Sequence, residues 1–123
     1  PAMHDLGSLT DGLRQAGLAT HIETSGTHPV SGVWDWVTLS PKKFKPCLDA
    51  WYQEADELKV VVVNSHDLTW AEEHAAKLVP GTAQFLQPEW DRREEVMARV
   101  LARIQEAPQW RLSLQTHKFI GLP

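Results

Sequence analysis

Four consecutive valines at residues 60–63 restrict the fold of this chain more than any other feature. They are contained in the segment over residues 57–63, which they end. An unbroken apolar run of this kind is typical of a parallel-sheet strand that is buried on both faces. We therefore predict a doubly buried strand over residues 57–63.

Segments with helical and with strand periodicity alternate before and after the valine run. Further strands are predicted over residues 18–22, 34–39, 83–87 and 110–114. Helices are predicted over residues 6–16, 67–78 and 91–104, and a helical or irregular segment over residues 48–55. Asp67 is expected to cap the second helix, and Asp91 with Glu94 has the spacing of a capping box for the third.

This alternation favours a mostly parallel sheet with right-handed crossovers, which is an α/β fold. Five strands in 123 residues are too few for an eight-stranded barrel, which needs about 250 residues. An open sheet or a partial β/α barrel remains. Since a domain averages about 150 residues, residues 1–123 are expected to form one domain or part of one.

Composition and charge exclude several classes of protein. An apolar content of 42% with 23% charged residues fits a soluble, core-forming chain. The net charge of −4 argues against a nucleic-acid duplex as the main partner. The longest apolar run is far shorter than the roughly 20 residues that span a bilayer. Cys47 is the single cysteine, so a disulfide or a multi-cysteine metal site cannot form within this chain alone.

The start of the chain is unusual, because Pro1 stands where a natural start would have methionine. Residues 1–18 have neither the basic nor the apolar stretch of a signal peptide. We therefore expect a cleaved or truncated product.

Polar residues follow every predicted strand. In parallel α/β folds, ligands bind beyond the carboxyl ends of the strands. Turn formation accounts for Ser, Gly, Asn and Pro at these places, but less well for Glu23, Lys42, Gln87 and Gln115. We therefore predict a ligand site along this edge of the sheet.

Other catalytic and metal-binding patterns are weak. The sequence contains no HExxH pair, and Ser25 lacks the G-x-S-x-G elbow of hydrolases. His66 and His117 lie at predicted strand ends, where a ligand role and a structural role stay open. Ordinary surface or core positions are expected for the other histidines, which are His4, His21, His28 and His74. The six tryptophans are expected to supply core or interface mass.

Four segments resemble one protein family in the same order along the chain. They are residues 21–27 (HIETSGT), 39–42 (LSPK), 85–89 (FLQPE) and 113–123 (SLQTHKFIGLP). Together they resemble the 7-carboxy-7-deazaguanine synthases, which are radical S-adenosylmethionine (SAM) enzymes. The resemblance covers nearly the whole chain and ends at the same C-terminal proline, whereas any one segment alone would be a weak signal.

The resemblance implies that residues 1–123 are the C-terminal portion of a partial β/α barrel of the radical SAM type. The family's cysteine motif for the [4Fe–4S] cluster lies upstream of the matching part. So do the segment with the Mg²⁺ ligand and most substrate-recognition residues. The chain alone is therefore expected to be inactive, with no catalytic residue and no metal ligand of its own.

For the parent enzyme, the resemblance implies a carbon–nitrogen lyase of queuosine and 7-deazapurine biosynthesis. A 5′-deoxyadenosyl radical from SAM would abstract a hydrogen atom from 6-carboxy-5,6,7,8-tetrahydropterin. Ring contraction with loss of ammonia would give 7-carboxy-7-deazaguanine. The parent is expected to be a cytoplasmic homodimer that binds this small carboxypterin and neither nucleic acid nor a membrane.

The same resemblance implies binding residues. Those expected to contact SAM are Glu23, Ser40, Pro41, Lys42, Leu86, Gln87, Pro88 and Glu89. Lys42 can face the methionyl carboxylate, and Glu23 can accept from ribose hydroxyls. Those expected to bind the carboxypterin are Gln115, His117 and Pro123, the last through its terminal carboxylate.

Two alternatives stay open. The first is another radical SAM enzyme, such as a glycyl-radical activating enzyme, although the C-terminal segment over residues 115–123 speaks against it. The second is a non-catalytic α/β module that binds a nucleotide-like ligand. The single cysteine favours this module only if the 123 residues are the whole gene product.

Overall fold

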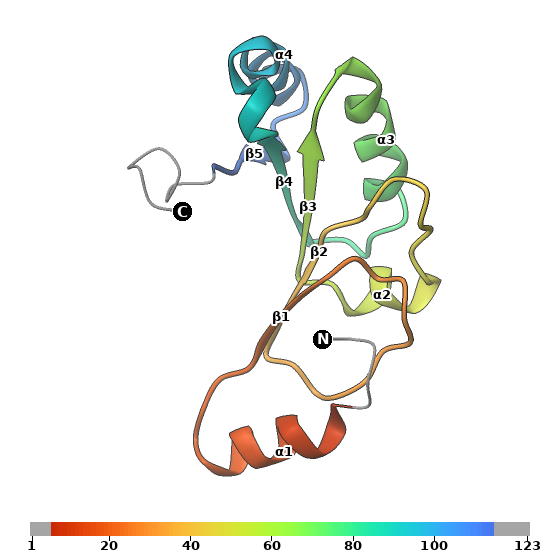
Figure 1. Ribbon diagram of the computed structural model, residues 1–123, viewed down its shortest axis with the longest axis vertical. Coiled ribbons are helices and arrows are strands. Elements are labelled where there is room, and N and C mark those ends of the chain that lie inside the picture. The colour runs from red at the N-terminus through yellow and green to blue at the C-terminus, as the bar shows by residue number, and fades with distance from the viewer. Residues whose placement is uncertain (1–5, 115–123) are drawn as a thin grey trace. The chain divides into compact units, whose positions relative to one another are not determined.

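The computed structural model describes residues 6–114, which form strands and helices in alternation (Figure 1). The strands are β1 (His21–Thr24), β2 (Trp36–Leu39), β3 (Glu57–Val62), β4 (Ala83–Pro88) and β5 (Trp110–Leu112). The helices are α1 (Gly7–Gln15), α2 (Asp49–Glu54), α3 (Ser65–Ala75), the 3₁₀ helix η1 (Trp90–Arg92) and α4 (Arg93–Glu106).

The strands form one sheet in the order β1-β2-β3-β4-β5. The pairs β1–β2, β2–β3 and β4–β5 are parallel. Parallel neighbours need crossover connections, and helices or long loops supply them here. The predicted α/β class with a mostly parallel sheet is confirmed.

The chain divides into two compact units, and β3 has residues in both. Unit 1 comprises Pro1–Leu58 and Leu78–Thr82, and unit 2 comprises Lys59–Lys77 and Ala83–Pro123. Each unit has its own apolar core.

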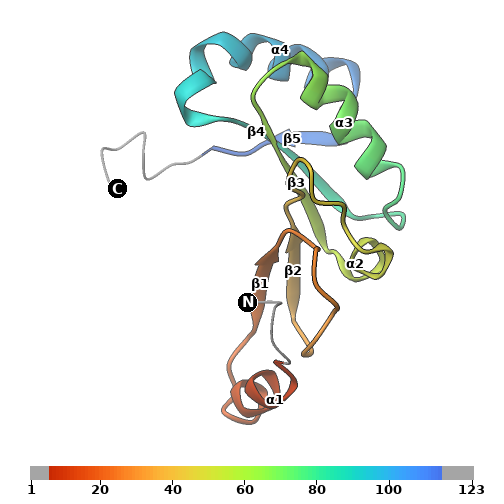
Figure 2. The ribbon, with the colours of Figure 1, turned by 45° about the vertical axis from the view of Figure 1, so that its right-hand side comes forward.

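In unit 1, α2 packs against β2 and covers one face of the strands (Figures 1 and 2). Trp51 of α2 is completely buried, and its indole N–H donates to the His28 backbone oxygen at 2.5 Å. The strands contribute the buried side chains of Ile22, Val37, Leu39 and Leu58. The Trp51–His28 hydrogen bond therefore also connects α2 to the segment that follows β1.

In unit 2, α4 packs on β4 and β5, and α3 lies beside α4 (Figures 1 and 2). Glu72 of α3 accepts from the Trp110 indole N–H at 2.7 Å and from Arg103 of α4 at 3.4 Å. Because Trp110 lies in β5, one carboxylate connects two helices and a strand. Val60, Val62, Leu68, Leu86, Val96 and Val100 fill the core around them.

The prediction of a strand buried on both faces over residues 57–63 is wrong in one respect. Leu58, Val60 and Val62 are completely buried, but the residues between them are partly exposed. The alternation shows that β3 is fully covered on one face only. The strand predicted from the valine run is present, but the prediction overstated how much of it is buried.

The first strand begins three residues later than predicted. Leu18 donates its backbone N–H to Leu13 and closes the end of α1, so it belongs to the helix terminus. The backbone N–H of Thr20 donates to the Asp35 carboxylate at 2.7 Å, and strand pairing starts only beyond this contact. This N–H also holds the pKa of Asp35 below its ordinary value.

The predicted helix caps also differ from those observed. Asp67 takes part in capping α3, but Asn64 rather than Asp67 is the N-cap residue. Asp67 lies in the first turn and completes a capping box, because its carboxylate accepts from the backbone N–H groups of Asn64 and Val63. At the next helix, Glu89 rather than Asp91 supplies the capping oxygen, which accepts from the Arg92 backbone N–H at 3.1 Å. Both corrections reflect turns that begin earlier than the apolar periodicity indicates.

The loop after β1 is fixed from several sides. Gly26 has a φ of +73°, and a Cβ built on it would lie 2.8 Å from Leu39 Cδ1. Its oxygen accepts from Leu48 N at 2.8 Å, and the Cys47 thiol donates to Ser25 O at 3.2 Å. The loop is therefore pressed against β2 and the start of α2, where only a glycine fits at position 26.

We expect Asp67→Ala to lower the free energy of unfolding by about 2 kcal/mol, because two backbone N–H groups lose a buried carboxylate acceptor. Asp91→Ala is the matched control and should change stability by less than about 0.5 kcal/mol, since Asp91 is exposed and supplies no cap. Urea unfolding monitored by circular dichroism measures both. Equal losses would show that Asp91 does cap a helix.

We expect Gly26→Ala to destabilise the chain by more than about 2 kcal/mol, because a positive φ and a close contact with Leu39 both oppose a side chain. Gly17→Ala separates the two causes. Gly17 has a φ of +77° but open space around its Cβ direction, so only the backbone cost of about 1 kcal/mol remains. Thermal unfolding of both variants provides the comparison, and a Gly26 variant no weaker than the Gly17 variant would contradict the close contact.

Candidate functional site

Unit 1 brings four of the predicted SAM-contacting residues to the carboxyl ends of β1 and β2. Glu23 is exposed on β1, and its register partner on β2 is Thr38. Directly after β2, the Ser40 backbone N–H donates to Thr24 O, the last residue of β1, at 2.8 Å. Ser40 is 5% exposed and Pro41 is buried, whereas Lys42 is exposed.

Lys42 begins a short turn that follows β2. An isolated antiparallel bridge pairs Lys42 with Lys45. Between them, Phe44 has a φ of 66° and a completely exposed side chain. The turn presents the Lys42 ammonium to solvent at the carboxyl end of the sheet.

Unit 2 gathers the other predicted SAM-contacting residues around the carboxyl end of β4. Gln87 is 5% exposed, and its side-chain oxygen accepts from the Ser113 hydroxyl at 3.1 Å. Glu89 donates its backbone N–H to Val62 O at 2.9 Å, while its carboxylate caps η1. Leu86 is completely buried and Pro88 is buried.

Each group lies at strand ends within its own unit, but Glu23 and Gln87 lie inside β1 and β4 rather than after them. Within unit 1 the structure brings Glu23, Ser40 and Lys42 together, and within unit 2 it brings Gln87 and Glu89 together. The predicted carboxypterin residues Gln115, His117 and Pro123 lie outside the described residues.

A hydrogen-bonded group on the face of unit 1 opposite α2 was not predicted. The His21 imidazole bonds the Thr38 hydroxyl at 3.0 Å, and Thr38 donates to Glu57 at 2.5 Å. The Trp36 indole N–H donates to the same Glu57 oxygen at 3.1 Å. The alternation of polar and apolar residues in His21-Ile22-Glu23 was the available signal, because it is typical of a strand with one open face.

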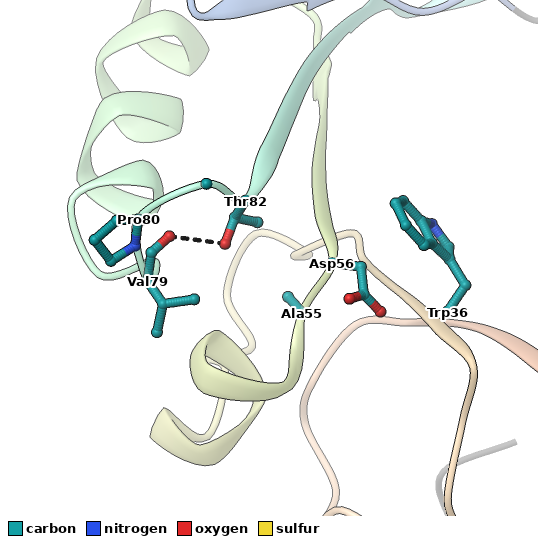
Figure 3. A pocket seen from close by; sticks show the side chains of 7 residues that line it. Trp36, Ala55, Asp56, Val79, Pro80 and Thr82 are labelled. Carbon is teal, nitrogen blue, oxygen red and sulfur yellow. Dashed lines mark hydrogen bonds between the residues drawn. The ribbon is translucent and has the colours of Figure 1, made fainter.

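An open pocket of about 250 Å³ lies at the opposite end of the unit 1 strands. Figure 3 shows Trp36, Ala55 and Asp56 at the amino ends of β2 and β3, facing the turn over residues 79–82. Thr82 donates its hydroxyl to Val79 O at 2.9 Å and closes this turn. The pocket contains none of the predicted SAM-contacting residues.

The strongest effects of burial on a pKa occur in helices. Burial, followed by the neighbouring Cys47, raises the pKa of Tyr52 in α2 far above its ordinary value. Burial also lowers the pKa of His74 in α3, with a smaller contribution from Lys77. Both shifts favour neutral side chains in the cores, so they mark packing rather than a reactive centre.

The residues that the structure describes do not fit a metal cluster. Among residues 6–114, no group of three His, Cys, Asp or Glu side chains is placed to hold a metal ion. Cys47 is partly buried and donates to Ser25 O. Neither a [4Fe–4S] cluster nor Mg²⁺ can be assigned to these residues. In the same part of the chain, no helix is long and apolar enough to cross a membrane.

The polar groups at the strand ends of unit 1, by contrast, are of the types that can pair with parts of SAM. A hydroxyl, an ammonium and a carboxylate at the edge of unit 1 can pair with a methionyl carboxylate and with ribose hydroxyls. The donor and acceptor set of unit 1 therefore has the chemistry that these two parts of SAM require.

Named relatives match along the whole chain. It is 46% identical over 123 residues to a 7-carboxy-7-deazaguanine synthase from Flavobacterium psychrophilum and covers 59% of that protein. It is 48% identical over 122 residues to a Synechocystis protein of the same name and covers 58% of it. The chain thus spans a little over half the length of these curated relatives. No protein-family model matches the chain.

The fold matches a solved structure as well. The crystal structure of QueE from Escherichia coli has a TM-score of 0.83 and 34% sequence identity to this chain. The match covers 94% of this chain and 53% of the QueE chain. In sequence and in fold, this chain therefore resembles the 7-carboxy-7-deazaguanine synthases, a family of radical SAM enzymes, over a length that fits the C-terminal portion of such an enzyme.

Proposed function

We propose that the chain is the C-terminal portion of an enzyme that converts 6-carboxy-5,6,7,8-tetrahydropterin to 7-carboxy-7-deazaguanine. The reaction is a SAM-dependent ring contraction with loss of ammonia, and it serves queuosine or 7-deazapurine biosynthesis. The observation that carries the proposal is the match of 46–48% identity to synthases of this name along essentially the whole chain.

In this proposal, the described residues bind and orient SAM. Lys42 pairs with the methionyl carboxylate, Ser40 supplies a hydroxyl beside it, and Glu23 accepts from the ribose hydroxyls. Pro41 shapes the same segment, and the segment over residues 86–89 contacts the remainder of the nucleoside. When bound, SAM supplies a 5′-deoxyadenosyl radical that abstracts a hydrogen atom from the carboxypterin.

The other parts of the site are assigned by family resemblance. Gln115, His117 and the terminal carboxylate of Pro123 bind the carboxypterin, whose ring N–H and amino groups are donors. An upstream portion of a longer protein holds the [4Fe–4S] cluster and Mg²⁺. We propose that this longer protein is a cytoplasmic homodimer.

We expect no SAM cleavage by the 123-residue chain alone, because a [4Fe–4S] cluster held by several thiolates cannot form on a single cysteine. The purified chain is incubated with iron, sulfide, dithionite and SAM, and 5′-deoxyadenosine is quantified against a no-protein control. A gene product that includes the proposed upstream portion should release it. Release by the 123-residue chain would contradict its inactivity, and no release by the longer product would contradict the proposed function.

In the longer enzyme, Lys42→Ala should weaken SAM binding by about ten- to a hundredfold, because a charge-assisted hydrogen bond contributes about 1.5–3 kcal/mol. Lys77→Ala is the matched control, since Lys77 is also exposed but follows α3. Calorimetric titration with SAM measures both variants. An unchanged dissociation constant for the Lys42 variant would remove this residue from the SAM site.

A further inference from the structure

In the hydrogen-bonded group on the open face of unit 1, the chemistry of the side chains determines which atom donates and which accepts each hydrogen bond. We call His21, Thr38, Glu57 and Trp36 the face network. In the sheet, His21 is the register partner of Trp36, and Thr38 is that of Glu57. The network therefore spans three neighbouring strands, and α2 lies on their other face.

The direction of each hydrogen bond follows from the carboxylate. An ionised Glu57 can only accept, so the Thr38 hydroxyl hydrogen points to Glu57 Oε1, 2.5 Å away. That hydroxyl has no second hydrogen, so it must accept from His21 Nε2, 3.0 Å away. The network therefore places a proton on Nε2 of His21, and in the neutral tautomer with this proton Nδ1 is a hydrogen-bond acceptor.

The Nδ1 atom is available to a ligand. His21 is an exposed residue, and within residues 6–114 the only hydrogen-bond partner of its imidazole is Thr38, through the opposite ring nitrogen. Glu23 lies two residues further along β1 on the same face, about 6.6 Å away along the strand. The open face thus carries two acceptors in line, of which the second is already proposed to bind SAM.

We propose that His21 is a ligand-binding residue whose Nδ1 accepts a hydrogen bond from an N–H or O–H group of the small molecule bound over this face. Thr38 and Glu57 are positioning residues that fix the ring and its tautomer. The inference rests on the proposed function, which supplies two ligands with such donors, namely SAM and the carboxypterin. This role differs from the ordinary surface position that the sequence indicates for His21.

Two substitutions at His21 separate the ring nitrogens. Asn places a side-chain oxygen near the Nδ1 position, whereas Gln reaches the Nε2 position and keeps only the contact with Thr38. We expect His21→Gln to weaken binding of one ligand about tenfold in the longer enzyme, and His21→Asn to retain most of the affinity. Separate titrations with SAM and with the carboxypterin show which ligand supplies the donor. His66→Gln, at an exposed histidine of α3, is the matched control and should change neither affinity.

Nitrogen-15 NMR of the histidine rings tests the tautomer directly on the 123-residue chain. The expected spectrum has the His21 proton on Nε2, and Thr38→Val should produce a mixture of tautomers. Thermal unfolding of each variant shows whether it remains folded.

The outcomes are distinguishable from those of the proposed function. If the unsubstituted longer enzyme binds neither SAM nor the carboxypterin, the proposed function fails. If it binds both and the Gln and Asn variants bind them equally well, the inference about His21 fails. A His21 proton on Nδ1 in the free chain would also overturn it.

Discussion

One backbone hydrogen bond recurs at the carboxyl ends of neighbouring strands, and the candidate site depends on it. In unit 1 it joins Ser40 N to Thr24 O, and in unit 2 it joins Glu89 N to Val62 O and Ser113 N to Leu86 O. In each case the donor is the first residue beyond a strand. The parallel ladder is thus extended by one residue, and the segments that carry the polar side chains are anchored to the rigid part of the sheet.

This anchoring suits ligand binding. A side chain on an anchored segment loses little backbone entropy when it binds, so more of the interaction energy appears as affinity. The loop after β1 shows the same property, because Gly26 is pressed against Leu39 while Cys47 and Leu48 bond the loop backbone. The proposed SAM contacts of Glu23 and Ser40 therefore start from a preformed backbone.

The two faces of the strands in unit 1 have different roles, because α2 covers only one of them. The side that α2 covers is filled with apolar groups such as Trp51 and Leu39, whose burial stabilises the unit. The opposite side carries the polar side chains of His21, Glu23 and Glu57, and Thr38 links His21 to Glu57 by hydrogen bonds.

The sequence by itself determined the order and type of the elements, because the apolar spacings of helices and strands are local. It also identified Glu23, Lys42 and Gln87 at strand ends, since turn formation alone does not require such side chains. Only the tertiary structure decided where β1 begins, because that depends on the bond between Thr20 and Asp35, fifteen residues apart. It likewise decided the burial of β3 and the face network, since the Thr38–Glu57 bond spans nineteen residues and no local pattern encodes it.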